Sequence, residues 1–293
     1  MLRNKKQRQN LSGYTFILPS LILLTVFVIA PIGISFFLSL NKYNGLKDPT
    51  WVGFKYYVDM FQDRDVRDAV WNTIVFVLIT VPGQVVISLG LAAILAAKFK
   101  NNFGAVIRGA LFIPELCSAA VVGIIFSYLF SADGEAFFNS ILLAIGLPKQ
   151  NWLGNPDLAL PVVSIVIIWK NIGYYLVIFY AGIMDVPINL YEAAELDGAS
   201  AWKQFWHITI PGLRNVLIMV ITICIIWSFQ MFDITYTMTQ GGPGNATTSL
   251  VLEIYKAAFK KHNFGYASAM AILLFVIIAV ITIIQRYATR EKD

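Results

Sequence analysis

Six long apolar stretches, separated by polar connections, divide the sequence. They cover approximately residues 14–40, 73–97, 109–130, 158–184, 213–232 and 267–284. Each stretch clears the length of roughly 17 to 25 residues that a helix needs to cross about 30 Å of hydrocarbon. The pattern predicts an all-α membrane protein with six transmembrane helices.

Composition supports this reading. Hydrophobic residues make up 58% of the chain and charged residues 13%, and the mean hydropathy is +0.68, which is too apolar for an ordinary soluble domain. We therefore expect a transmembrane domain over residues 14–284, with tails at 1–13 and 285–293. The first stretch is too long for a signal peptide and is interrupted by Pro19 and Pro31. Cys117 and Cys224 lie in apolar stretches, which offers no disulfide framework and no CxxC metal or redox site.

The distribution of basic residues predicts the orientation. Cytoplasmic connections carry an excess of Lys and Arg, and the distribution favours an N-terminus and a C-terminus in the cytoplasm. The net charge of +5 then indicates membrane anchoring and no nucleic-acid partner. The twelve basic residues on the inner side are Arg3, Lys5, Lys6, Arg8, Lys98, Lys100, Arg108, Lys203, Arg214, Arg286, Arg290 and Lys292, against nine in longer outer loops.

The connection over residues 185–212 has a helical pattern of its own. Asp185 is expected to cap a first helix that begins near Val186 and has Pro187 in its first turn. Gly198 fits the break after that helix, because glycine readily takes a positive φ. A second short helix is expected over residues 199–207, ending before Pro211. We predict a cytoplasmic helix-turn-helix segment.

This segment is suited to a protein partner. Glu192, Glu195 and Asp197 offer charge, and the small residues around Gly198 let another surface approach the backbone. The alternative is an amphipathic helix on the inner membrane surface. Such helices usually carry Lys and Arg on their polar face, whereas anionic lipid would repel an acidic face.

The same residues resemble a known family. Glu192-Ala193-Ala194, then Gly198, then Ile208, Ile210 and Pro211 are similar to the "EAA" motif of membrane subunits of binding-protein-dependent ABC importers. The one departure is Ile210, where the family usually has Leu. The sequences at 191–199, 239–243 and 264–269 look like the branch that contains the maltose, glycerol-phosphate and multiple-sugar permeases, and the resemblance covers roughly residues 10–290.

The resemblance implies a type I ABC importer permease fold and a division of labour. The segment would dock on a dimer of ATP-binding subunits, with a paralogous permease subunit, an extracytoplasmic solute-binding protein and a carbohydrate substrate as further partners. No cofactor is expected in this chain, because no GxxxxGK[ST] motif occurs and the partner ATPase would bind ATP and Mg²⁺. The residues implied in ATPase coupling are Glu192, Ala193, Ala194, Asp197, Gly198 and Pro211.

A polar group inside the fourth stretch suggests a transport pathway. Lys170 lies near its middle, where a Lys costs roughly 2.5 to 3.5 kcal/mol on an insertion scale, so it should face a wet cavity or a carboxylate. Aromatic rings can stack on the apolar side of a sugar ring, and polar side chains can bind its hydroxyl groups. The candidates here are Trp169, Lys170, Asn171, Tyr174 and Tyr175, although packing between helices would explain each aromatic residue alone.

The resemblance adds a second pathway region at Trp227, Ser228, Gln230 and Met231. Lys170 is not standard in the maltose subunit, so it indicates either a different or charged sugar or a structural ion pair. Glu115 is expected to be structural, either satisfying freed backbone donors or pairing with Arg108. The outer segment over residues 240–248 is expected to meet the binding protein or to be an exposed turn.

Two other function classes fit less well. A secondary transporter would show internal repeats and a coupling-ion site, and the acidic segment would have no purpose in it. An intramembrane enzyme would need a catalytic set inside the spans, yet His207 and His262 lie in connections. The sequence therefore predicts a multi-pass permease subunit of a carbohydrate importer in a bacterial inner membrane.

Overall fold

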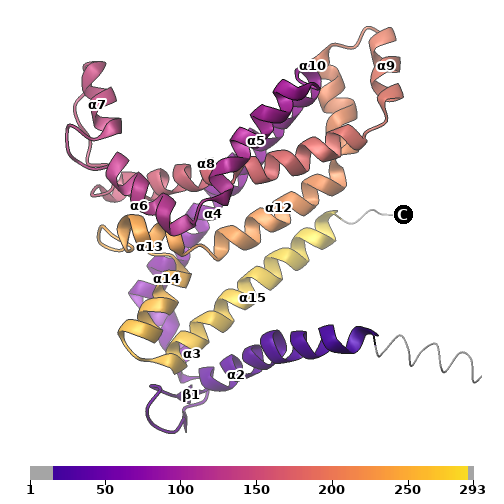
Figure 1. The fold of residues 1–293 in the computed structure, drawn as a ribbon. Coiled ribbons are helices and arrows are strands. Elements are labelled where there is room, and N and C mark those ends of the chain that lie inside the picture. Colours follow the sequence, from indigo (N-terminus) through magenta and orange to yellow (C-terminus); the bar gives the residue numbers. More distant parts are fainter. Residues whose placement is uncertain (1–15, 290–293) are drawn as a thin grey trace, which may run out of the picture. The chain divides into compact units, whose positions relative to one another are not determined.

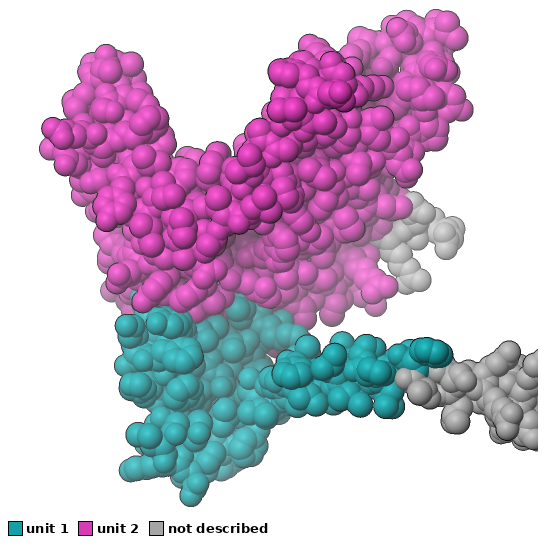
Figure 2. All heavy atoms as spheres, viewed as in Figure 1, with its two compact units in different colours: residues 1–62, 254–275 teal, residues 63–253, 276–293 magenta. Residues whose placement is uncertain are grey.

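The computed structural model describes residues 16–289. Predictions that fall on Arg3, Lys5, Lys6, Arg8, Arg290 and Lys292, on the tail over residues 1–13 and on the last residues of the 285–293 tail lie outside the described residues. The described chain is mostly helical (Figure 1), and its residues divide into two compact units (Figure 2). Unit 1 holds residues up to 62 together with 254–275, and unit 2 holds residues 63–253 together with those from 276 onward.

Four described helices are long and apolar enough to cross a membrane. Two bent helix pairs raise the number to six if each pair counts as one span. The four helices are Phe16–Ser39, which contains the π-helical η1 (Thr25–Ile29) and α2 (Ala30–Ser39), and α4 (Arg64–Lys98), α8 (Pro156–Asp185) and α15 (Phe264–Thr289). They coincide with the first, second, fourth and sixth predicted stretches, although α4 begins nine residues earlier than expected because Asp63 caps it by accepting from the Asp65 N–H.

The third predicted stretch is not one straight helix. α5 (Asn102–Leu116) and α6 (Ala119–Leu129) meet at 94°. Pro114, in the last turn of α5, has no N–H for the helix, and Cys117 and Ser118 are extended. The stretch predicted from 109 to 130 is therefore a bent pair of helices, broken at Cys117 and Ser118, and it crosses a membrane as one span only if the two helices are taken together.

The fifth predicted stretch is also bent. α12 (Arg214–Phe229) follows the segment Ala201–Gly212 at an angle of 73°. Its 16 residues extend about 24 Å at 1.5 Å per residue, less than the hydrocarbon thickness of about 30 Å. The span expected up to Phe232 ends at Phe229, and α13 (Asp233–Thr239) follows.

The core of unit 2 lies among α4, α8 and α12. Leu89 and Leu95 of α4 pack with Tyr175 and Phe179 of α8 and with Val220 of α12. Towards the other end, α6 and α13 join α4 and α8 in a second cluster around Phe76, Val166 and Ile234. α7 (Phe137–Ala144) and α9 (Ile188–Leu196) lie at opposite ends of this unit (Figure 1).

Besides the long helix Phe16–Ser39 and the first part of α15, the described part of unit 1 contains a short hairpin and two short helices. β1 (Asn41–Lys42) and β2 (Thr50–Trp51) are antiparallel, with Asn41 opposite Trp51, and α3 covers Lys55–Gln62. Gly265 of α15 approaches the Asn41 carbonyl closely, and its N–H donates to the Tyr43 oxygen at 3.2 Å. α14 (Leu250–Tyr255) and the π-helical η3 (Lys256–Lys260) precede α15.

The crossing of α5 and α8 allows a test of the packing. A Cβ added at Gly173 would collide with the backbone of Leu111 and Phe112, whereas one added at Gly109 would meet nothing within 4 Å. We expect Gly173→Ala to destabilise the protein by about 1–3 kcal/mol, the usual cost of overpacking. Gly109→Ala should leave stability unchanged or raise it by up to about 1 kcal/mol through helix propensity.

Thermal unfolding of the two purified variants in the same detergent checks this expectation. Equal melting temperatures for Gly173→Ala and the unmodified chain would contradict the close crossing.

Candidate functional site

The predicted helix-turn-helix segment begins where α8 ends. Asp185 is the last residue of α8, Val186 is extended, and α9 starts at Ile188 after Pro187. Asp185 therefore does not cap the following helix, which begins two residues later than expected. The reason is that α8 continues through Asp185 before the chain extends at Val186, so that Pro187, which cannot donate a backbone hydrogen bond, takes the capping position.

The turn of the segment depends on Gly198. Its φ is +74°, its N–H donates to the Glu195 oxygen at 3.0 Å, and the Ala199 N–H donates to the Ala194 oxygen at 2.8 Å. These two bonds form a Schellman motif, which satisfies the last carbonyl groups of α9 and needs a residue with positive φ. The prediction that Gly198 ends the first helix with a positive φ is confirmed.

The second limb continues further than expected. It consists of α10 (Ala201–Gln204), the π-helical η2 (Phe205–Thr209) and α11 (Ile210–Gly212). The prediction that this limb ends before Pro211 was wrong. The Ile210 N–H donates to the Phe205 oxygen, so the turn just before Pro211 is widened, and a wide turn relieves the clash between proline and the preceding turn.

Several contacts join the two limbs into one hairpin, which we call the coupling hairpin (residues 185–212). The Tyr191 and Thr209 hydroxyl groups lie 2.9 Å apart, and the buried Thr209 belongs to the second limb. The Gln204 amide donates to the Ala199 oxygen at 3.2 Å. At the base, a Cβ on Gly212 would lie 2.9 Å from the Val186 side chain. The hairpin is therefore an ordered element joined directly to α8 and α12.

The coupling hairpin presents an exposed surface. Glu192, Glu195 and Asp197 are exposed, and a hollow of about 360 Å³ lies between the limbs. The sequence reasoning missed two further exposed residues, Leu196 at 90% and Trp202 at 69%. The signal was available in the sequence, because both large apolar side chains lie close to the polar turn at Gly198. The six residues implied in coupling are placed here together: Glu192, Ala193, Ala194, Asp197, Gly198 and Pro211.

The pathway candidates centre on an ion pair. Lys170 is buried, and its Nζ lies 3.1 Å from the Glu115 carboxylate and 3.4 Å from the Glu115 backbone oxygen. Lys170 therefore meets a carboxylate, one of the two environments expected for it. The carbonyl belongs to the last turn of α5, where helical carbonyls have no intrahelical partner and where a cation is favoured.

Arg108 has a different neighbour from the one considered. Its guanidinium lies over the Tyr180 ring at 3.9 Å from the centroid, and Glu115 pairs with Lys170. The option of an Arg108–Glu115 pair is therefore wrong. A cation over an aromatic face gains about 0.5–2 kcal/mol. α8 supplies one ring, Tyr180, to Arg108 of α5 and one cation, Lys170, to Glu115 of α5.

Aromatic rings from α8 and α12 meet beside this ion pair. The Tyr174 ring lies 5.2 Å from Trp227, and the Tyr175 ring lies 6.2 Å from Trp227. Tyr175 is fully buried, whereas 41% of Trp227 is exposed. The two predicted pathway regions are thus brought together by these three residues.

The other pathway candidates surround this cluster less closely. Trp169 packs on Phe126 of α6 at 5.0 Å, and the Ser228 hydroxyl lies 3.0 Å from that of Thr80. Met231 lines a cavity of about 10 Å³, room for about one water molecule, together with Ser228. Asn171 is half-buried on α8, and Gln230 is exposed at the end of α12.

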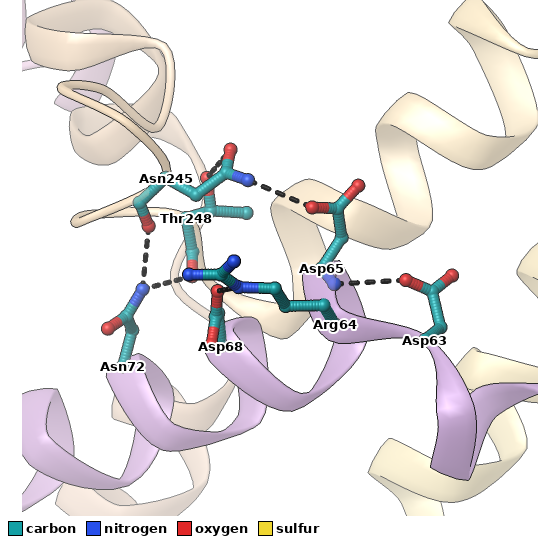
Figure 3. Close-up of polar contacts among 7 residues, drawn as sticks. All are labelled: Asp63, Arg64, Asp65, Asp68, Asn72, Asn245 and Thr248. Atoms are coloured by element: carbon teal, nitrogen blue, oxygen red, sulfur yellow. Dashed lines mark hydrogen bonds and ion pairs between the residues drawn. The ribbon is translucent and has the colours of Figure 1, made fainter.

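The segment over residues 240–248, which the sequence predicts on the outer side, is a braced loop. Asn72 of α4 donates to the Asn245 oxygen at 2.7 Å and to the Thr248 oxygen at 3.2 Å, and Asn245 donates to Asp65 at 3.0 Å (Figure 3). Inside the loop, the Thr239 and Thr247 hydroxyl groups lie 2.6 Å apart. These bonds fix the loop against the first turns of α4, so it is more than a simple exposed turn.

The chain is similar to known proteins in sequence and in fold. The chain is 32% identical over 278 residues to the sulfoquinovosyl glycerol transport system permease protein SmoG of Agrobacterium fabrum, a match that covers 94% of this chain and 89% of SmoG. It is also 32% identical over 292 residues to the lactose transport system permease protein LacF of Rhizobium radiobacter, covering 98% and 97% of the two chains.

The fold is shared with a solved structure. A chain in the crystal structure of a bacterial ABC transporter involved in the import of the acidic polysaccharide alginate matches with a TM-score of 0.85 and 22% identity, covering 99% of each chain. At that identity the likeness concerns the fold. The model of a family described as "binding-protein-dependent transport system inner membrane component" matches residues 61–292. The chain therefore belongs to this family of inner membrane components of binding-protein-dependent transport systems.

Proposed function

We propose that the chain is a permease subunit that moves a carbohydrate into the cell by alternating access, driven by a separate ATPase. The observation that carries this proposal is the coupling hairpin, an ordered and exposed element that continues into α8 and α12. The aromatic rings of Tyr174, Tyr175 and Trp227 meet on those two helices. Motion at the hairpin would therefore reach the pathway through two helices. The family assignment removes the secondary-transporter alternative.

The proposed topology has six spans, with α5 and α6 together forming one and α12 forming another, and with both termini and the coupling hairpin in the cytoplasm. The position of α7 and α9 at opposite ends of unit 2 supports it, because the connections at those ends then lie on opposite membrane sides (Figure 1). ATP and Mg²⁺ are bound by a dimer of partner subunits. A paralogous permease completes the pathway, and a solute-binding protein docks on the outer side near the braced loop over residues 240–248.

Carbohydrate is the proposed cargo because aromatic rings and polar groups converge in one place. The partly exposed rings of Tyr174 and Trp227 provide apolar faces for a sugar ring, and the Tyr174 hydroxyl group provides a hydrogen bond. The fully buried Tyr175 packs against both rings. SmoG and LacF are named for transport of a sugar derivative and a disaccharide. We propose that this chain transports a carbohydrate, as the names of these relatives indicate for them, and we do not assign a particular sugar.

Partner capture tests the whole proposal. We expect a mild-detergent pull-down of the natively expressed chain to recover an ATP-binding subunit, a second permease and a solute-binding protein, identified by mass spectrometry. Native mass spectrometry of the binding protein should then detect a bound carbohydrate. A bound amino acid or peptide would contradict the proposal that the cargo is a carbohydrate. Recovery of the chain without any ATP-binding subunit would contradict the proposal that the hairpin couples to an ATPase.

The turn of the coupling hairpin gives a second prediction. Gly198→Asp should insert normally and lose coupling, because the side chain strains a residue at φ +74° and projects from the docking surface into open space. We expect a fall of at least about tenfold in ATP-dependent uptake, which corresponds to about 1.4 kcal/mol of lost docking energy.

Gly146→Asp is the matched control for this prediction. Gly146 has φ +78°, nothing within 4 Å of an added Cβ, and the same two-bond motif after α7, at the other end of unit 2. It should therefore bear the same backbone strain without loss of coupling. Wild-type uptake by Gly198→Asp, or equal losses in the two variants, would contradict the role of Gly198.

The ion pair gives a third prediction. Lys170→Met leaves the Glu115 carboxylate without its partner, and we expect altered uptake rate or selectivity with normal assembly. A hydrogen bond to a charged group contributes about 1.5–3 kcal/mol to the free energy of unfolding. Its loss should therefore lower the melting temperature. The double variant Lys170→Met/Glu115→Gln should recover the stability, because no unpaired charge remains. Unchanged uptake of every substrate by both variants would make the pair purely structural.

A further inference from the structure

The second limb of the coupling hairpin carries an exposed aromatic stripe. Trp202 is 69% exposed and Trp206, one turn later, is 48% exposed. Their ring centroids lie 5.7 Å apart, and the Phe205 ring packs against both, at 6.1 Å from Trp202 and 5.4 Å from Trp206. Burial of one large side chain is favourable by roughly 1.5–3 kcal/mol, so this stripe requires another surface to cover it.

Charge divides between the two limbs. The exposed side chains on α9 and its turn include Glu192, Glu195 and Asp197, all acidic. The exposed titratable side chains of the second limb are Lys203 and His207. No acidic residue occurs between Ser200 and Gly212. A surface that attracts one limb electrostatically would repel the other, so the two limbs are suited to different partners.

The covalent path places the second limb at the membrane boundary. It runs directly into α12 through the 73° bend at Leu213, and the first residue of α12 is Arg214. A limb that leaves a span at this angle runs across the direction of the span rather than along it. Trp residues are enriched where spans meet the aqueous phase, and basic residues near the cytoplasmic leaflet gain about 1 kcal/mol each from anionic lipid.

We propose that the second limb of the coupling hairpin, residues 201–212, rests on the anionic lipid surface of the inner leaflet through Trp202, Trp206 and Lys203. α9 and the turn at Gly198 are then the part of the hairpin that docks on the ATPase, and Pro211 acts only by shaping the second limb. The lipid surface acts as a support behind the docking helix, so that force applied to α9 moves α8 and α12 instead of deforming the hairpin. This inference rests on the proposed cytoplasmic position of the hairpin.

Charge complementarity and continuity with a span decide for lipid over a groove of the ATPase. The limb that would need to enter such a groove has Lys203 and His207 exposed, whereas α9 has the acidic residues and the highly exposed Leu196. One basic groove cannot favour both limbs. A lipid headgroup layer satisfies the basic residues, and the interface beneath it accommodates the indole rings.

Fluorescence quenching by spin-labelled lipid tests the proposal in the assembled transporter. Ala201→Cys reports on the second limb and Ala193→Cys on the first, since both alanines are exposed and small. The exposed Cys117 is replaced by Ser in both variants, and the buried Cys224 stays. Each complex, with partner permease and ATPase, is labelled with an environment-sensitive fluorophore and placed in nanodiscs that contain headgroup-proximal doxyl lipid.

We expect at least about twofold stronger lipid quenching at position 201 than at 193, with and without the ATPase, and a larger difference in anionic than in zwitterionic nanodiscs. Adding Trp202→Ser/Trp206→Ser to the Ala201→Cys reporter should reduce its quenching to the level at 193. Equal quenching at both positions overturns the proposal. So does shielding of position 201 from aqueous quencher only when the ATPase is present, because that result assigns the stripe to a protein groove.

Sidedness separates this inference from the proposed function. In sealed vesicles of known orientation, a membrane-impermeant thiol reagent added outside should modify neither cysteine if the hairpin is cytoplasmic. Labelling of both cysteines from outside refutes the proposed topology, and the inference with it. Protection from outside together with equal lipid quenching refutes the lipid contact alone.

Discussion

The structure depends on one constraint: wherever a helix breaks in or beside hydrocarbon, the backbone groups that the break frees need new partners. The break after α5 uses a side chain, because Lys170 reaches the Glu115 carbonyl while it neutralises the Glu115 carboxylate. The break after α9 uses the backbone itself, through the two-bond motif around Gly198. Before Pro211 the chain remains helical by widening one turn. These contacts favour a defined angle at each break.

Such breaks allow one chain to connect the coupling hairpin, which we propose to be cytoplasmic, with the aromatic cluster on α8 and α12. α8 reaches from the Lys170–Glu115 pair and the tyrosines to the base of the coupling hairpin, and α12 returns from the hairpin to Trp227. The buried core of α4, α8 and α12 holds these two helices together over their shared length. A displacement of the hairpin is therefore expected to move the aromatic cluster with it, which is what a transporter driven by a separate ATPase requires.

The sequence predicted those features that depend on local chemistry. Apolar length located four spans well, and the need of Gly198 for positive φ was read correctly from its place between two helical patterns. The failures concern competition between local and distant effects. Pro114 bends the third stretch despite its apolar length, and Pro211 does not end its helix because the preceding turn widens. Glu115 pairs with Lys170, which is 55 residues away in the sequence, and not with Arg108 on its own helix. Only the packing of α5 on α8 decides between these two partners.

The central claim is that the coupling hairpin and its two helices move as one rigid body. The most direct measurement is the distance between spin labels at Glu195 on α9 and Asp157 in the first turn of α8, both exposed, recorded by pulsed EPR in the assembled transporter with and without ATP trapped in the partner subunits. A rigid body gives an unchanged distance within this chain, while the distance from either label to the partner permease changes. A change of several ångströms within the chain would show that the hairpin bends, and would contradict the account.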